Sequence, residues 1–343
     1  MCGREGMGSA TTPGARPAAS VANVSGTSAM VAGPARRRFG ATGRQLRSAW
    51  ATALVTIVAV VWTIPTFGLL VTSLRPTELS SYSGWWAAFA DRTLTLDNYR
   101  EVISGGETLP DGIAPYLVNT VAIAVPATVV PIVLGCLAAY AIAWIPFRGA
   151  TLVLAGAVAL QVVPIQMALV PLTQLFYSGW SIGPLHVSPP INPETGRSVL
   201  TGTYLPLWVA HTMFALPLAV FLLHHFIARL PRELFEAARI DGASHFTVFR
   251  VLVLPLALPA IASLAIFQFL WVWNDLLVAL TFASGSPDVA PVTAYLAYLN
   301  GGFGSKEYLL ASGAFVSIAV PLVVFFALQR YFARGLLAGA MDG

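Results

Sequence analysis

The chain has 343 residues, of which 57% are hydrophobic and only 10% are charged. Soluble domains carry about 25% charged residues, so the composition excludes an ordinary water-soluble globular protein. The formal net charge is +4 at pH 7, but the basic residues are distributed by membrane side, as described below, and do not indicate nucleic acid as a partner. The two cysteines, Cys2 and Cys136, cannot form a disulfide framework and lie in no metal-ligand pattern.

The first 47 residues are rich in Gly, Ala, Ser, Thr and Pro and contain no apolar run. Such a composition cannot bury enough surface to fold, and it lacks the apolar core of a secretory signal. We expect residues 1–47 to form a disordered cytoplasmic tail. Residues 48–343 are then expected to form a single transmembrane domain.

Six apolar stretches are long enough to cross a membrane. A bilayer core about 30 Å thick needs roughly 20 helical residues, and this length is met at about 49–74, 116–145, 150–176, 203–227, 256–283 and 307–329. The second to sixth stretches contain or adjoin prolines, which membrane helices tolerate where neighbouring helices or a cavity satisfy the freed backbone groups. The sequence therefore predicts an all-α, polytopic membrane protein with six transmembrane helices in a transporter-like bundle.

The distribution of Lys and Arg sets the orientation of these spans. With the N-terminal tail inside the cell, 14 of the 19 basic residues lie on the cytoplasmic side and 5 outside. Both termini and the polar loop at 229–255 are thus predicted to be cytoplasmic in the cell membrane. The outer loops carry Trp85, Trp86 and Trp180, which fit either an interfacial aromatic belt or a landing surface for an extracytoplasmic partner.

Motifs for catalysis or for an energy source are missing from the sequence. The only lysine, Lys306, belongs to no phosphate-cradling motif, and Asp275 is the one clear carboxylate within the spans. His211, His224 and His225 fall in the fourth span, but no zinc-protease motif or Ser/His protease motif surrounds them. We therefore expect no enzyme, no metal site and no cofactor in this chain, and we expect its energy to come from another chain.

The polar loop is patterned as two short helices. Pro231 suits the first helical turn, Gly242 suits the position just beyond a helix end, and Ser244 can cap a second helix. That second helix is predicted to run over 245–254 and to end at Pro255. Three interpretations fit this pattern: a connector lying on lipid headgroups, a DNA-reading helix-turn-helix, and a knob for a soluble partner. The membrane span that follows at once argues against the DNA reader.

The same loop resembles a known family. Glu236-Ala237-Ala238, then Gly242, then Leu252-Val253-Leu254-Pro255 is similar to the EAA loop of permease subunits in binding-protein-dependent ABC importers, with Leu252 replacing the usual isoleucine. The resemblance implies a type I importer permease fold whose loop forms a coupling helix, seated in a cleft of an ATP-hydrolysing subunit. The residues it assigns to coupling are Glu236, Ala237, Ala238, Asp241 and Gly242.

The resemblance extends over roughly 50–343 and indicates the carbohydrate branch. Asn119-Thr120, Trp273-Asn274-Asp275 and the ending from Gln329-Arg330-Tyr331-Phe332 onward resemble maltose G-subunit permeases, and Trp62 to Arg75 followed by Gly84-Trp85-Trp86 resembles α-glucoside permeases. The implied partners are a second homologous permease, an ATPase dimer that binds ATP and Mg²⁺, an extracytoplasmic sugar-binding protein and membrane lipid.

Polar and aromatic residues within the spans are candidates for the substrate path. Amides and an aromatic plate would suit a weak sugar site, and the candidates are Asn119, Gln161, Gln166, Gln268, Trp271, Trp273, Asn274 and Asp275. For each of them, hydrogen bonding between helices is the alternative role. We expect import of an oligosaccharide or glycoside; the alternatives are another solute (a peptide, polyamine or phosphonate) and a membrane scaffold that transports nothing.

Overall fold

The computed structural model describes residues 39–80, 82–106, 111–187, 198, 200, 202–283, 288–300 and 306–340. The chain divides into two units, residues 1–59 and residues 60–343. The described part of the first unit belongs to helix α1 (Phe39–Ser73), which continues into the second unit. Most of the expected tail thus lies outside the described residues, and its last part, 39–47, is helical.

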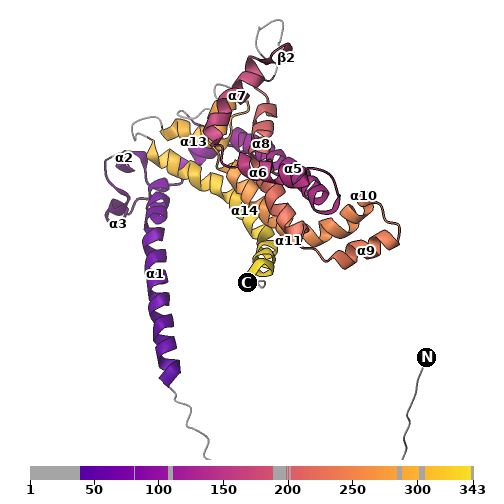
Figure 1. The fold of residues 1–343 in the computed structure, drawn as a ribbon. Helices are drawn as coiled ribbons and strands as arrows, with labels where there is room; N and C mark the ends of the chain where they lie inside the picture. Colours follow the sequence, from indigo (N-terminus) through magenta and orange to yellow (C-terminus); the bar gives the residue numbers. More distant parts are fainter. Residues whose placement is uncertain are drawn as a thin grey trace, which may run out of the picture. The chain divides into compact units, whose positions relative to one another are not determined.

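Within the described residues, five helical segments are long and apolar enough to cross a bilayer (Figure 1). They are Ala49–Ser73 of α1, α5 (Ala114–Trp144), α8 (Leu205–Ile227), His245–Trp273, and Glu307–Ala327 of α14 (Glu307–Ala340). The third predicted span, 150–176, is a pair of helices, α6 (Ala150–Leu160) and α7 (Ile165–Tyr177), that meet at 101°. The expectation of an all-α membrane fold with six spans is confirmed if this bent pair is counted as one of them.

The bend corrects the expectation of one continuous helix at 150–176. Pro164 precedes α7 in an extended conformation, with φ −60° and ψ 134°. Its ring lacks an N–H and disfavours a helical conformation at the preceding residue, so α6 cannot run on into α7.

The fifth predicted span, about 256–283, also differs at both ends. Its helix begins with α10 (His245–Val248), passes through a π-helical turn (Phe249–Val253) and continues as α11 (Leu254–Trp273). Contrary to our expectation, Pro255 does not end the helix. It lies just beyond the π-helical turn, where the regular hydrogen-bonding pattern of the α-helix is already interrupted. Residues beyond Trp273 form the separate short helix α12 (Leu277–Phe282).

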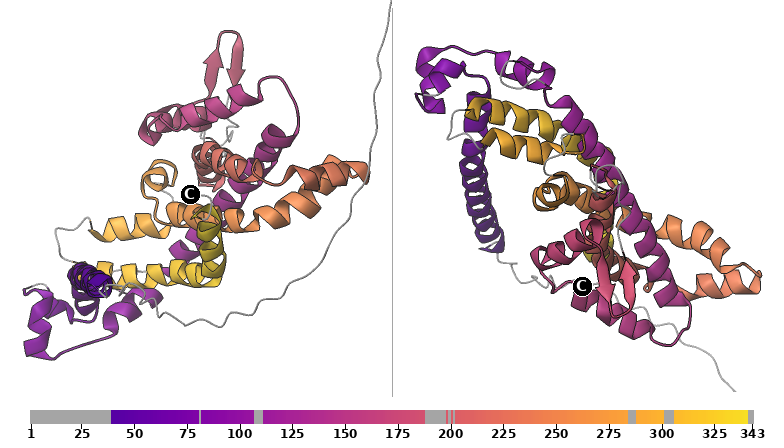
Figure 2. Two further views of the ribbon diagram at one scale, coloured as in Figure 1. Left: turned by 60° about the horizontal axis from the view of Figure 1, so that its bottom comes forward. Right: turned by 90° about the horizontal axis from the view of Figure 1, so that it is seen from above.

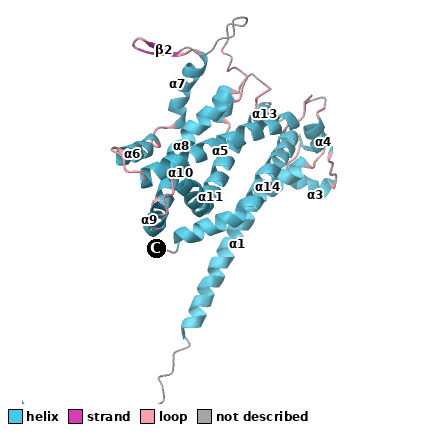
Figure 3. Ribbon diagram, turned by 90° about the vertical axis from the view of Figure 1, so that its right-hand side faces the viewer, coloured by secondary structure: helices cyan, strands magenta, loops and turns pink. Residues whose placement is uncertain are grey.

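The shorter elements join the spans. They are α2 (Thr77–Ser80), the 3-10 turn Trp85–Ala87, α3 (Ala88–Asp91), α4 (Asp97–Ser104), α9 (Arg232–Ile240) and α13 (Val292–Asn300). The sequence did not indicate a small antiparallel hairpin of β1 (Trp180–Ile182) and β2 (Leu185–Val187), which follows α7 (Figure 3). Gly183 supplies the positive φ of +55° in its two-residue turn.

The core of the second unit forms where α5, α8 and α11 pack together (Figure 2). Small residues allow α5 and α8 to approach closely: a methyl group added at Gly135 would lie 2.9 Å from Cβ of Ala219. Helix α14 packs against α11 and α4. A separate apolar cluster, which includes Ile113, Val292 and Leu309, joins α13 and α14 to the beginning of α5.

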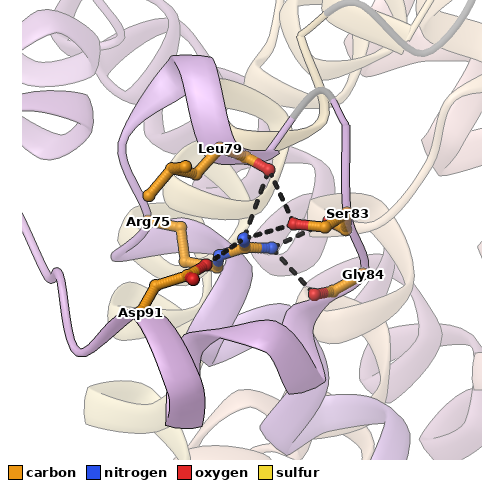
Figure 4. Close-up of polar contacts among 5 residues, drawn as sticks. All are labelled: Arg75, Leu79, Ser83, Gly84 and Asp91. Atoms are coloured by element: carbon orange, nitrogen blue, oxygen red, sulfur yellow. Dashed lines mark hydrogen bonds and ion pairs between the residues drawn. The ribbon is translucent and has the colours of Figure 1, made fainter.

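Arg75 organises the segment that follows α1 (Figure 4). Its side chain is 1% exposed, and its guanidinium donates to the carbonyl oxygens of Ser83 and Gly84 at 2.8 Å and to that of Leu79 at 3.2 Å. Asp91 lies 3.5 Å away and neutralises the charge. A single arginine therefore holds together the turn that carries α2 and α3.

We expect Arg75→Met to lower the free energy of unfolding by about 1–3 kcal/mol, because the carbonyl groups of 79, 83 and 84 lose their buried donor. Thermal unfolding of the protein in detergent measures this change. Arg100→Met is the matched control, because its pair with Asp97 is 80% and 74% exposed and such surface pairs contribute little. Equal unfolding midpoints for the two variants would contradict the assigned role of Arg75.

Candidate functional site

The polar loop between α8 and α11 is held by an aromatic stack. Phe235 of α9 is buried and stacks on Trp144 at the end of α5, with ring centroids 3.5 Å apart and ring planes at 12°. Nε1 of Trp144 donates to the carbonyl oxygen of Ile227, the last residue of α8, at 3.1 Å. Helix α9 is therefore attached to the ends of two spans.

The second half of the loop is fixed by polar contacts. Nδ1 of His245 and the hydroxyl of Tyr140, on α5, share a hydrogen bond of 2.9 Å. The hydroxyl of Ser244 accepts from the backbone N–H of Thr247 at 3.2 Å, which confirms the predicted helix cap. Gly242 ends α9 with φ +71°, and Ala243 N–H donates back to Ala238, the bonding expected of a glycine-terminated helix.

The residues assigned to coupling face away from the bundle. Glu236, Ala237, Asp241 and Gly242 are exposed, and Ala238 is half-buried against the apolar cluster under the loop. A methyl group added at Gly242 would meet no atom within 4 Å. The structure thus gathers all five residues on one ordered element and leaves four of them accessible.

Sequence reasoning missed two apolar members of this surface. Ile240 is 87% exposed and Phe246 is 69% exposed, whereas Phe235 and Val248 of the same loop are buried. The signal for Ile240 was its position in α9: five residues beyond Phe235, it falls about 140° round the helix from the buried face. Exposed apolar side chains flanking the Gly242 turn are suited to a protein partner.

A cavity of about 560 Å³ lies among the spans, lined by the α6–α7 break, α8 and α11. Its polar and aromatic lining includes Gln161, His211, Gln268, Trp271 and Phe214. Gln268 donates from Nε2 to the carbonyl oxygen of Ala127 at 3.3 Å, which holds its amide against α5. Small-molecule sites occupy roughly 300–1,000 Å³, so this cavity is large enough for one.

The structure separates the candidates for the substrate path into two groups. Gln161, Gln268 and Trp271 line the cavity, as does His211, which sequence reasoning had not proposed for this role. The other candidates lie elsewhere: Asn119, Gln166, Trp273, Asn274 and Asp275 are not among its lining residues.

Most of the second group have identifiable structural contacts. Trp273 is 1% exposed within the core. Asn119 donates to Ala290 and accepts from Tyr204, Asn274 donates to the carbonyl of Leu270 within its own turn, and Asp275 accepts from the N–H of Ala279 in α12. The bonds of Asn119, Asn274 and Asp275 are of the interhelical or local kind named above as the alternative role. A place for these residues and for Trp273 on the substrate path stays a prediction.

Apolar spans around a cavity, with an ordered polar loop at one end, are the arrangement of a membrane transport subunit. Residues 131–337 match the family described as "Binding-protein-dependent transport system inner membrane component". The osmoprotective compounds uptake permease GgtD of Synechocystis is 45% identical over 293 residues, which cover 84% of this chain and 90% of that protein. The alpha-glucoside transport system permease AglG of Rhizobium meliloti is 49% identical over 249 residues, which cover 73% of this chain and 60% of AglG.

Among solved structures, a bacterial ABC transporter involved in the import of the acidic polysaccharide alginate matches with a TM-score of 0.63. The sequence identity is 17%, and the match covers 88% of this chain and 100% of that one, so it supports the fold alone. With the family match and the two relatives, the chain belongs to the binding-protein-dependent transport system inner membrane components. It is a transport permease and not an enzyme, as expected, and its family implies a binding protein and an ATPase as partners.

We expect Phe235→Ala to loosen α9, because the stack on Trp144 supplies the burial that this short helix needs. Amide hydrogen exchange over 232–240 in the detergent-purified protein should become about tenfold faster or more. Phe246→Ala is the matched control, because that ring is exposed and its loss should leave exchange over 232–240 unchanged. Equal exchange in Phe235→Ala and the unsubstituted protein would rule out the stack as the anchor.

Proposed function

We propose that this chain is a permease subunit of an ATP-driven importer that moves a sugar, an oligosaccharide or glycoside, into the cell. Its partners would be a second homologous permease, an ATPase dimer that binds ATP and Mg²⁺, and an extracytoplasmic sugar-binding protein. The observation that carries the proposal is the ordered loop with Glu236 and Gly242 exposed, in a chain of this family.

The name of one of the two relatives supports a glycoside as the substrate. One relative takes up osmoprotective compounds and the other transports alpha-glucosides, and both are more than 40% identical to this chain over most of its length. The segment with Gly84-Trp85-Trp86, which resembles α-glucoside permeases, is built around Arg75 in this structure.

The geometry of the loop supports docking of an ATPase. Glu236 places a carboxylate on the exposed face, where Arg232 and Arg239 are also exposed. Ala237 and Gly242 are small enough to let another backbone approach. Ile240 adds an apolar side chain that a cleft could bury. The excess of basic residues at this end of the spans supports a cytoplasmic location for the loop and for both termini.

Coupling would then be mechanical. Closure of the ATPases on ATP would displace α9 as a rigid body, and the stack of Phe235 on Trp144 would carry that displacement into α5. The covalent connections of the loop would carry it into α8 and α11. A rigid-body change of this kind would alternate access to the bundle between the two membrane faces.

We expect Glu236→Lys and Gly242→Leu each to reduce sugar uptake per ATP hydrolysed, because both alter the docking surface without touching the bundle. The measurement compares uptake with ATP hydrolysis in proteoliposomes that hold the complete transporter and its binding protein. If docking is weakened by roughly 1.4 kcal/mol, its equilibrium constant falls about tenfold, and we expect coupled uptake to fall by up to that factor.

Gly149→Leu is the matched control for Gly242→Leu. Gly149 also has a positive φ, +94°, and a Cβ there would also meet nothing within 4 Å, but it lies between α5 and α6. Both substitutions therefore strain the backbone in the same way, and only Gly242→Leu changes the docking surface. If Glu236→Lys and Gly242→Leu import sugar as efficiently as Gly149→Leu, the loop does not couple ATP hydrolysis to transport.

A further inference from the structure

The cavity coincides with the break between α6 and α7. A broken helix within a membrane is tolerated where its backbone is buried in protein or lines a cavity, and transporters place substrates at such breaks. The N–H groups of Gln161, Val162 and Val163 bond back to carbonyl groups of α6, at 3.1, 3.1 and 3.2 Å. Because these three N–H groups are already hydrogen-bonded, a ligand at the break would be recognised by side chains.

The side chains that reach the cavity have the chemistry of a neutral, hydroxyl-rich ligand. The amides of Gln161 and Gln268 and the imidazole of His211 can each donate and accept hydrogen bonds, and Trp271 offers an aromatic face that is 59% exposed. The rest of the lining is mostly aliphatic. Sugars present both hydroxyl groups and apolar C–H faces, and this combination of amides and an aromatic ring matches both.

Charge further narrows the class of ligand. The described residues that line the cavity include no aspartate, glutamate, lysine or arginine. A charged solute in such an apolar site would be left without a counter-charge, which is costly away from water. Asp275 lies 3.8 Å from Nε2 of His211, but it does not line the cavity and accepts from the N–H of Ala279. The lining therefore favours a neutral glycoside over a peptide, polyamine or phosphonate.

We propose that this cavity is a glycoside-binding subsite on the translocation path, held by this subunit itself. Gln161 and Gln268 bond sugar hydroxyl groups, Trp271 packs on a C–H face, and His211 completes the polar wall. The inference rests on the proposed function and deepens it, because it names the residues that meet the sugar and excludes charged solutes.

The test begins with uptake by the complete transporter in proteoliposomes, with its binding protein and with labelled trehalose, sucrose and maltose as probes. For the sugar that the unsubstituted complex imports, we expect Gln161→Leu and Trp271→Ala to reduce uptake at least about tenfold. Sugar affinity of the binding protein and basal ATP hydrolysis should not change. Gln174→Leu is the matched control: Gln174 is exposed on α7 outside the cavity, and uptake should stay at the level of the unsubstituted complex.

A second measurement detects occupancy directly. A thiol introduced by Gln161→Cys, in a chain that also carries Cys2→Ser, should react with a soluble maleimide, and the imported sugar should slow that reaction. Cys136 is buried, so the parent chain with Cys136 alone measures the background. Citrate, a polyanion, should give no protection, and protection by citrate equal to that by sugar would overturn the neutral-ligand assignment.

The outcomes separate the two proposals. If the unsubstituted complex imports none of the three sugars, the proposed function fails and the subsite fails with it. If the complex imports a sugar, but Gln161→Leu and Trp271→Ala transport it normally and the sugar does not protect the Gln161→Cys thiol, only the subsite is wrong. Selective loss of uptake together with protection supports the subsite.

Discussion

The aromatic stack between α5 and α9 is the contact on which the proposed docking surface of this chain depends. Helix α9 has nine residues and buries one of them, Phe235, so it has little else to keep it folded, since isolated helices of that length are marginal in water. Stacking on Trp144 supplies this burial and also fixes the rotation of the helix. The same contact that stabilises α9 therefore decides that Glu236 and Ala237 face outward.

The lipid environment gives the second constraint, because backbone groups at membrane depth need partners inside the protein. The spans meet this demand in different ways. Helix α5 continues through Pro126 and Pro131 as one helix, whereas the pair α6 and α7 turns by 101° at the break before Ile165. At this turn the N–H groups of residues 161–163 donate to carbonyl oxygens of residues 158–160 in α6. This pairing of the backbone lets an irregular segment border a cavity without leaving those N–H groups unpaired.

Hydropathy and local motifs predicted much of this architecture. Both ends of the expected spans 116–145 and 203–227 lie within two residues of the ends of α5 and α8. The pattern around Gly242 and Ser244 predicted the end of α9 and the start of α10. The bend at Pro164 was not predictable, because proline interrupts some membrane helices and not others, and neighbouring helices decide which.

The sequence also did not predict which face of α11 lines the cavity. Trp271 and Trp273 are two residues apart and lie on nearly opposite faces of one helix, and composition does not reveal which face meets the core.

The loop and the cavity are connected by the same two helices. The cavity wall on α8 is formed by residues 211–218, nine residues or more before that helix ends at Ile227, and the wall on α11 by Gln268 and Trp271. Residue 268 lies 14 residues beyond the start of α11, or about 21 Å along a helix that rises 1.5 Å per residue. Because the loop is the covalent link between these helices, any displacement of α9 acts on both walls together. A displacement at the proposed ATPase-docking surface can therefore reach the proposed sugar site through α8 and α11 alone, because these two helices both join the loop and line the cavity.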